Sequence, residues 1–225
     1  MMQELESLEA LSNDDKACEM AAYHKAKRRY LGVGNGRIDE LVAQWRAARD
    51  LPDRIALAAQ LWDSDIHEAR IAAAKLLTQA RMRPDEEVWQ LITSWVPQFD
   101  GCAVADAAMI AGQKRVIAAP QRLVEVAPWL QQDNIWVRRA ALTITLPWAK
   151  MNNPKPHEIE QRELVLGWAA GLVEDRNWFI QKAIAGWLRD LSKRDASRVS
   201  GFLQQYGDRM KPFARREAAR LIQDL

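Results

Sequence analysis

A short pattern with chemically active side chains occurs five times in the sequence. Its copies read RIAA at Arg70, ADAA at Ala105, RRAA at Arg138, QKAI at Gln181 and REAA at Arg216. The second position of each copy, directly before the small pair, holds in turn Ile71, Asp106, Arg139, Lys182 and Glu217. A carboxylate stabilises a developing positive charge and positions water, whereas guanidinium and ammonium groups bind phosphate. If the second positions meet in space, they form a row that combines these two chemistries.

The spacing of the copies predicts that they do meet. Successive copies lie 35, 33, 43 and 35 residues apart, which is the period of stacked helical repeats. Equivalent helix positions in such an array project along one wall, usually the concave wall formed by the second helix of each pair. We therefore expect Asp106, Arg139 and Lys182 to lie side by side. The same row could also be a solvated charged ladder that only stacks the repeats.

Amphipathic helices must position this row. Apolar residues recur at intervals of three and four, and turn-forming residues such as GVGNG and NNPKP separate the periodic stretches. No stretch alternates in the manner of a strand. The fold class expected is therefore all-α, a HEAT-like solenoid of stacked antiparallel helix pairs, with residues 1–225 as a single domain. The helices predicted are Asp14–Tyr30, Arg37–Ala48, Ile66–Met82, Glu86–Val96, Trp136–Trp148, Glu158–Val173, Phe179–Leu191 and Lys211–Leu225.

Composition narrows the function classes. Apolar residues make up 48% of the chain and charged residues 28%, so the chain has globular composition. Its net charge of +2 is only a weak sign of a polyanionic partner. Two cysteines cannot make a disulfide framework, and neither a signal peptide nor a membrane span is visible, so we expect a soluble, cytoplasmic protein. The three histidines are far apart in the sequence, which argues against a metal site.

Several segments resemble the HEAT-like DNA alkylation repair glycosylases of the AlkD type. These are MAAYHKAKRRYLGV at 20–33, QLWDSDIHEARIAAAKLL at 60–77, DNIWVRRAAL at 133–142, NWFIQKAIAGWLRDLSK at 177–193 and KPFARREAARLI at 211–222. The likeness runs in order over almost the whole chain. It implies a DNA glycosylase, a hydrolase of base excision repair, that excises positively charged N3- and N7-alkylated purines. It further implies double-stranded DNA as a largely sequence-independent partner, no metal, no cofactor, a nucleoid-associated location, and by default a monomer.

The resemblance also implies roles for individual residues. The family's catalytic aspartate falls on Asp106 and its conserved arginine on Arg139. Asp106 would stabilise the oxocarbenium-like sugar and position water, while Arg139 would bind a phosphate or keep the carboxylate ionised. The residues expected to contact DNA are Tyr23, Trp136, Arg138, Lys182, Trp187, Arg189, Arg215 and Arg216. Arg215 and Arg216 are equally compatible with an exposed helix end.

The sequence departs from the family at two tryptophans that hold the sugar of the damaged nucleotide. Cys102 stands at the first position and Gly186 at the second, with Trp187 displaced by one residue, a rotation of about 100° on a helix. Trp95, Phe99 or Trp187 could substitute. Three functions therefore stay open: a glycosylase for small cationic lesions, a related glycosylase for bulky alkyl adducts, and a non-catalytic HEAT-like module that binds DNA structures or a protein.

Overall fold

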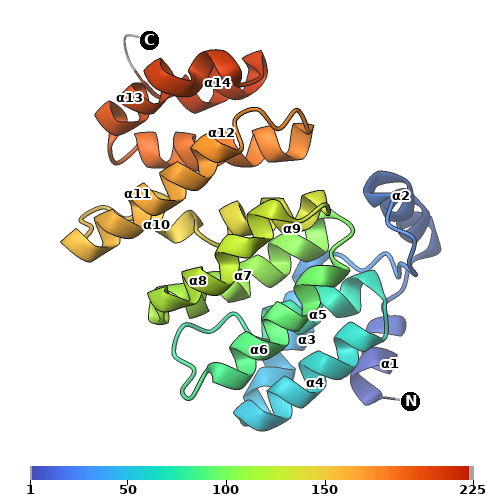
Figure 1. Cartoon of the computed structure of the whole chain (residues 1–225). Coiled ribbons are helices and arrows are strands. Elements are labelled where there is room, and N and C mark those ends of the chain that lie inside the picture. The colour runs from blue at the N-terminus through green and yellow to red at the C-terminus, as the bar shows by residue number, and fades with distance from the viewer. Residues whose placement is uncertain (1, 223–225) are drawn as a thin grey trace. The chain divides into compact units, whose positions relative to one another are not determined.

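Helices make up nearly all of the regular structure. The computed structural model describes residues 2–222, and within that range no β-strand is present; Arg29 and Ile66 form an isolated parallel bridge. The chain divides into two compact units, Met1–Ala118 (unit 1) and Ala119–Leu225 (unit 2), whose helices are drawn in Figure 1. The prediction of an all-α helical-repeat fold is confirmed. The prediction of a single domain stays a prediction.

Unit 1 is built around one buried helix. Its helices are α1 (Gln3–Glu9), α2 (Asp14–His24), α3 (Asn35–Ala47), α4 (Leu51–Asp63), α5 (His67–Leu76), α6 (Glu86–Trp95) and α7 (Cys102–Ala118), with a 3-10 turn η1 (Val96–Gln98). α5 packs against α3, α4 and α7. Its alanines at 72, 73 and 74 are fully buried, and such small side chains let the neighbouring helices approach closely.

A buried carboxylate attaches the chain between α2 and α3 to this central helix. Glu68 is fully buried and accepts hydrogen bonds from the backbone N–H groups of Leu31, Gly32 and Val33 at 3.0, 2.8 and 3.3 Å. Gly32 has φ +75°, and a Cβ there would lie 2.2 Å from the Asn13 carbonyl oxygen. Only glycine therefore fits at the centre of this loop.

We expect Glu68→Gln to lower the free energy of unfolding by about 2 kcal/mol, because a neutral amide offers one oxygen acceptor and forms weaker hydrogen bonds than a carboxylate. Urea unfolding followed by circular dichroism measures the change. Glu40→Gln, at an exposed position of α3, is the matched control and should change the free energy of unfolding by less than about 0.5 kcal/mol. Equal stability of the two variants would contradict a structural role for Glu68.

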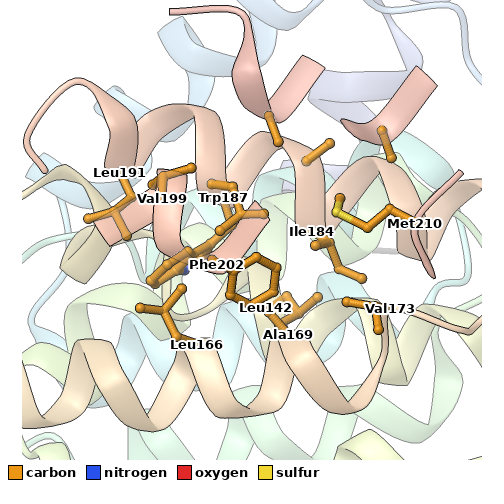
Figure 2. Close-up of a cluster of buried hydrophobic side chains, with 14 of the residues drawn as sticks. Leu142, Leu166, Ala169, Val173, Ile184, Trp187, Leu191, Val199, Phe202 and Met210 are labelled. Carbon is orange, nitrogen blue, oxygen red and sulfur yellow. The ribbon is translucent and has the colours of Figure 1, made fainter. Parts of the chain in front are cut away.

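Unit 2 continues the pattern of helix pairs. Its α-helices are α8 (Leu123–Val126), α9 (Ile135–Thr143), α10 (Leu146–Lys150), α11 (Pro156–Gly171), α12 (Trp178–Ser192), α13 (Ala196–Tyr206) and α14 (Pro212–Ala219), and its 3-10 turns are η2 (Pro120–Arg122), η3 (Ala127–Gln131) and η4 (Gly207–Arg209). α12 is central and packs against α9, α10, α13 and α14. Its core surrounds Trp187, with Leu166, Ile184 and Phe202 among the buried neighbours (Figure 2).

Local capping sets the helix boundaries that periodicity alone did not give. The helix predicted over Asp14–Tyr30 ends at His24, because Lys25 adopts the left-handed conformation with φ 59°. The helix predicted over Trp136–Trp148 is two helices, α9 and α10, separated at residues 144 and 145. The predicted helices Ile66–Met82 and Lys211–Leu225 end at Leu76 and Ala219, although residues 223–225 lie outside the described range. α1, α4, α8 and α13 lie outside the predicted ranges, and α7 was indicated only by the copy of the repeated pattern at Ala105.

The first position of the repeated pattern has a structural role. Arg70 donates to the Trp62 carbonyl oxygen at 3.1 Å, Arg138 to the carbonyl oxygens of residues 132 and 133, and Gln181 to those of residues 173 and 175. Each side chain thus ties the second helix of a pair to the turn that precedes it. This shared bond explains the long polar donor at the first position of these three copies.

Candidate nucleic-acid interface

A hollow of about 440 Å³ opens on unit 2 between α9, α12 and α14. Cationic, aromatic and small side chains share its wall. The lining residues are Arg139, Leu142, Thr143, Leu146, Trp178, Lys182, Ala183, Ala185, Gly186, Trp187, Arg189, Asp190, Phe213 and Glu217. We call it the unit-2 hollow. Its size suits a small ligand or one nucleotide.

The second positions of three consecutive repeats meet at this hollow. Arg139 comes from α9, Lys182 from α12 and Glu217 from α14, and all three line the same wall. The repeat spacing predicts that Asp106, Arg139 and Lys182 lie side by side; the hollow brings together Arg139 and Lys182 of that row, and Glu217 at the equivalent position of the last copy. Arg139 and Lys182 give the wall two cationic groups, while Glu217 accepts a hydrogen bond of 2.5 Å from Arg189.

An aromatic pair at this hollow was not among the residues predicted from the sequence. Trp178 begins α12 and stacks on Phe213 of α14 with ring centroids 6.0 Å apart. The Lys182 ammonium lies 4.7 Å from the centroid of the Trp178 ring, a favourable cation–π contact. The only sequence signal is the i, i+4 spacing of Trp178 and Lys182, which places the two side chains on one helix face.

Two of the cations predicted to contact DNA are engaged within the protein. Arg138 forms an ion pair with Asp175 at 3.0 Å in addition to its bonds to the preceding turn. It therefore has a structural role in holding the repeat together, and its contact with DNA stays a prediction. Arg189 pairs with Glu217 and lies 3.7 Å from Asp190, so its charge is largely offset. It still lines the unit-2 hollow.

The other predicted contacts in unit 2 differ in exposure. Arg215 is exposed and pairs with Asp208 at 2.6 Å, and Arg216 is exposed on the same helix. Both remain compatible with an exposed helix end. Trp136 is half-buried, with its ring centroid 4.5 Å from that of Phe179. Packing between α9 and α12 therefore accounts for most of its side chain.

Trp187 belongs to the core of unit 2 (Figure 2). Its exposed fraction is 0%, and a fully buried indole cannot touch a duplex. The prediction that Trp187 contacts DNA is therefore wrong, because the rotation of one residue turns the side chain inward. Trp95 and Phe99, the other suggested substitutes for the missing tryptophans, are also buried.

Asp106 lies on α7 of unit 1 and is half-buried. Ala105, directly before it, and Ala108, two residues after it, are buried, whereas Ala107 is half-buried, so Asp106 stands at the edge of the buried face. Ala103, one turn earlier on the same side, lines a second hollow of about 360 Å³ in unit 1. The side-by-side placement of Asp106 with Arg139 of unit 2 stays a prediction from the repeat spacing.

Rings of α2 and α5 gather at this unit-1 hollow. His24 and His67 line it, and their ring centroids are 4.5 Å apart; Tyr30 stacks on His67 at 4.7 Å. Tyr23, predicted to lie near the lesion, is 77% exposed and meets His24 edge-on at 5.0 Å. Two histidines that are far apart in the sequence thus meet in space. Among the described residues no group of three or more His, Cys, Asp or Glu side chains could hold a metal ion.

His67 is 2% exposed, and its ring nitrogens have no hydrogen-bond partner among the described residues. Burial lowers the pKa of His67 from 6.5 to about 4, helped by His24 and Arg28. The unfolded chain therefore takes up a proton near pH 6.5 while the folded chain does not, so stability falls as the pH drops from 6.5 to 4. We expect wild type to lose about 3 kcal/mol more than His67→Phe across this window.

Urea unfolding at several pH values tests this expectation, with exposed His157→Gln as the matched control. The control should follow the wild-type curve. Parallel curves for wild type and His67→Phe would show that His67 does not couple folding to protonation.

The family model described as "DNA alkylation repair enzyme" matches residues 4–222. The chain belongs to this family. A comparison with curated protein sequences gives no significant match.

Solved structures of similar fold agree with this family. A predicted DNA alkylation repair enzyme from Enterococcus faecalis is 22% identical with a TM-score of 0.77, over 95% of this chain and 98% of that one. AlkD2 from Streptococcus mutans is 20% identical with a TM-score of 0.62, over 86% of this chain and 92% of that one. The protein smu.31 from the same species is 20% identical with a TM-score of 0.64, over 84% and 92% of the two chains. At these identities the likeness establishes the fold.

In this member of the DNA alkylation repair family, Gly186 faces open space. A Cβ built on Gly186 would meet no atom within 4 Å, so this side of the unit-2 hollow is open. Both cysteines have free thiols; Cys102 is half-buried and Cys18 is exposed. Within residues 2–222 no helix has the length and apolar character needed to cross a bilayer.

Proposed function

We propose that this protein is a DNA glycosylase that excises positively charged N3- and N7-alkylated purines from duplex DNA. The observation that supports it most is the meeting of Arg139, Lys182 and Glu217 in one hollow of a chain from the DNA alkylation repair family. Asp106 occupies the same position of the repeated pattern in unit 1. The proposal thus assigns DNA binding and catalysis to a single row of side chains.

The lesion itself makes the reaction feasible with few catalytic groups. An N3- or N7-alkylated purine carries positive charge, so it leaves without being protonated, and the sugar develops oxocarbenium character. A carboxylate at about 4 Å with an effective dielectric constant near 20 stabilises that charge by about 4 kcal/mol. This corresponds to roughly three powers of ten in rate. Such an acceleration suits a labile lesion and leaves an unmodified base in place.

Cations of the unit-2 hollow would bind the DNA backbone. Arg139 and Lys182 line the hollow together, and contacts between such groups and phosphates carry no sequence information. Binding should therefore be largely independent of sequence. It should also weaken as salt is raised, because the slope of the logarithm of the binding constant against the logarithm of salt concentration becomes more negative by about 0.9 for each phosphate neutralised. We propose that the protein acts as a monomer and without a metal or cofactor, since neither the DNA binding nor the base release described above needs a second subunit, a metal or a cofactor.

A second candidate is a glycosylase for bulky alkyl adducts. The open space at Gly186 favours it, because a larger adduct could occupy the volume that an indole fills in other family members. A non-catalytic DNA-binding module is the alternative if neither kind of lesion is released.

Release of 3-methyladenine and 7-methylguanine from methylated duplex DNA tests the proposal. Wild-type protein should release both bases faster than buffer alone, and should release none from unmodified DNA. Salt-dependent binding without release of either base would contradict the small-lesion function. The same assay with DNA carrying bulky alkyl adducts would then separate the second candidate from a non-catalytic module.

A further inference from the structure

One indole of unit 2 is exposed in a way that the fold does not require. Trp178 is 47% exposed and is the most exposed of the ten tryptophans, all of which the structure describes. A single exposed apolar side chain is common on a protein surface, but this ring lies at a concave site lined by cations and stacks on a second aromatic ring, a combination that points to a ligand. Trp178 lines the unit-2 hollow together with Arg139 and Lys182.

The fold holds this ring in place. Asn177 caps α12 by accepting a hydrogen bond of 2.9 Å from the Phe179 N–H, and Asp175 accepts one of 2.8 Å from the Asn177 N–H. The backbone at Trp178 is therefore fixed at the first turn of the helix. Phe179 meets Trp178 edge-on at 5.0 Å, and Phe213 stacks on it with an angle of 26° between the rings. The indole is thus a preorganised surface.

Lys182 can contact either the Trp178 ring or a DNA phosphate. Its ammonium lies over the Trp178 ring at 4.7 Å, and its side chain is exposed. A flexible lysine moves readily to a phosphate oxygen, which would uncover the face of the indole. Aromatic surfaces combined with cations that follow the backbone are how proteins bind unpaired nucleotides.

We propose that the unit-2 hollow binds one unpaired nucleotide of the DNA, with its base stacked on Trp178 and its phosphate held by Lys182 and Arg139. The open space beside Gly186 gives room for the sugar. Trp178 is then a positioning residue that supplies an aromatic surface in the hollow that Gly186 also lines. This inference rests on the proposed function only in taking DNA as the ligand.

The test compares two labelled duplexes of the same sequence, one fully paired and one with a single unpaired nucleotide, by fluorescence anisotropy at matched salt. Wild type should prefer the second duplex by about tenfold, since stacking of one base is worth that much or more. Trp178→Ala should remove the preference, because it should weaken binding of the duplex with the unpaired nucleotide by about tenfold and binding of the paired duplex by far less, whereas Trp178→Phe should keep part of the preference. Lys182→Ala should weaken binding of both duplexes equally and lower the salt dependence.

Ile159→Ala is the matched control, because Ile159 is similarly exposed on α11 and lies outside the hollow. It should behave as wild type, and equal Tm values will show that each variant folds. A wild type without preference, or a Trp178→Ala variant that keeps it or loses affinity for both duplexes equally, would overturn the inference. If wild type releases no base yet Trp178 governs the preference, the proposed function fails and this inference stands. If wild type releases base and Trp178→Ala keeps the preference, the proposed function stands and this inference fails.

Discussion

Replacing Asp106 by asparagine is expected to slow the release of 7-methylguanine from methylated duplex DNA by two orders of magnitude or more. The change removes the negative charge and keeps the size of the side chain. At about 4 Å and an effective dielectric constant near 20, that charge is worth about 4 kcal/mol to the oxocarbenium-like sugar. Release should be measured under single-turnover conditions, so that the rate reports bond cleavage.

Asp63→Asn is the control for this variant, because Asp63 is an exposed aspartate at the end of α4. It should release base at the wild-type rate. Binding of undamaged duplex by Asp106→Asn should stay within about threefold of wild type, since one carboxylate repels phosphate only weakly in water. A variant that releases base as fast as wild type would show that Asp106 is not the catalytic carboxylate.

Replacing Trp187 by alanine is expected to lower the free energy of unfolding by about 3 to 5 kcal/mol. Trp187 is fully buried among Leu166, Ile184 and Phe202 (Figure 2), and truncating such a ring leaves a cavity that the neighbours fill only in part. Urea unfolding measures the loss. Trp187→Phe should lose less, because a phenyl ring fills more of the space and removes an indole N–H that has no hydrogen-bond partner among the described residues.

DNA binding separates this structural role from the one predicted from the sequence. At a temperature where Trp187→Phe is fully folded, its affinity for duplex DNA should equal that of wild type. A variant with unchanged stability and weakened DNA binding would instead show that Trp187 contributes to the DNA interface.

The repeated pattern predicted more of the molecule than any single motif. Its period predicted the helical-repeat fold, and its second position predicted a row of Asp106, Arg139 and Lys182, of which Arg139 and Lys182 line one hollow of unit 2. Both results depend only on the regularity of stacked helices, in which equivalent positions share a face. The structural role of the first position was not predicted, because a basic residue such as Arg138 looks the same in the sequence whether it faces phosphate or a neighbouring turn.

Helix phase and helix ends could not be predicted in the same way. Trp178 and Trp187 lie on the same helix and are both apolar, yet one is 47% exposed and the other buried, because their exposure depends on where α13 and α14 pack. The end of α2 at His24 depends on the left-handed Lys25 and on the loop bound by Glu68. That loop brings His24 to His67 from 43 residues away, a tertiary contact that leaves no local pattern.

Cleavage of one defined glycosidic bond is the most direct test of the proposed function. A duplex with a single 7-methylguanine is incubated with excess protein, and alkali then converts each abasic site into a strand break at that position. We expect strand breaks at the lesion with wild type, well above the buffer control, and at least a hundredfold fewer per unit time with Asp106→Asn bound to the same extent. Intact strands in a fully bound wild-type complex would contradict the account and leave a DNA-binding module without this activity.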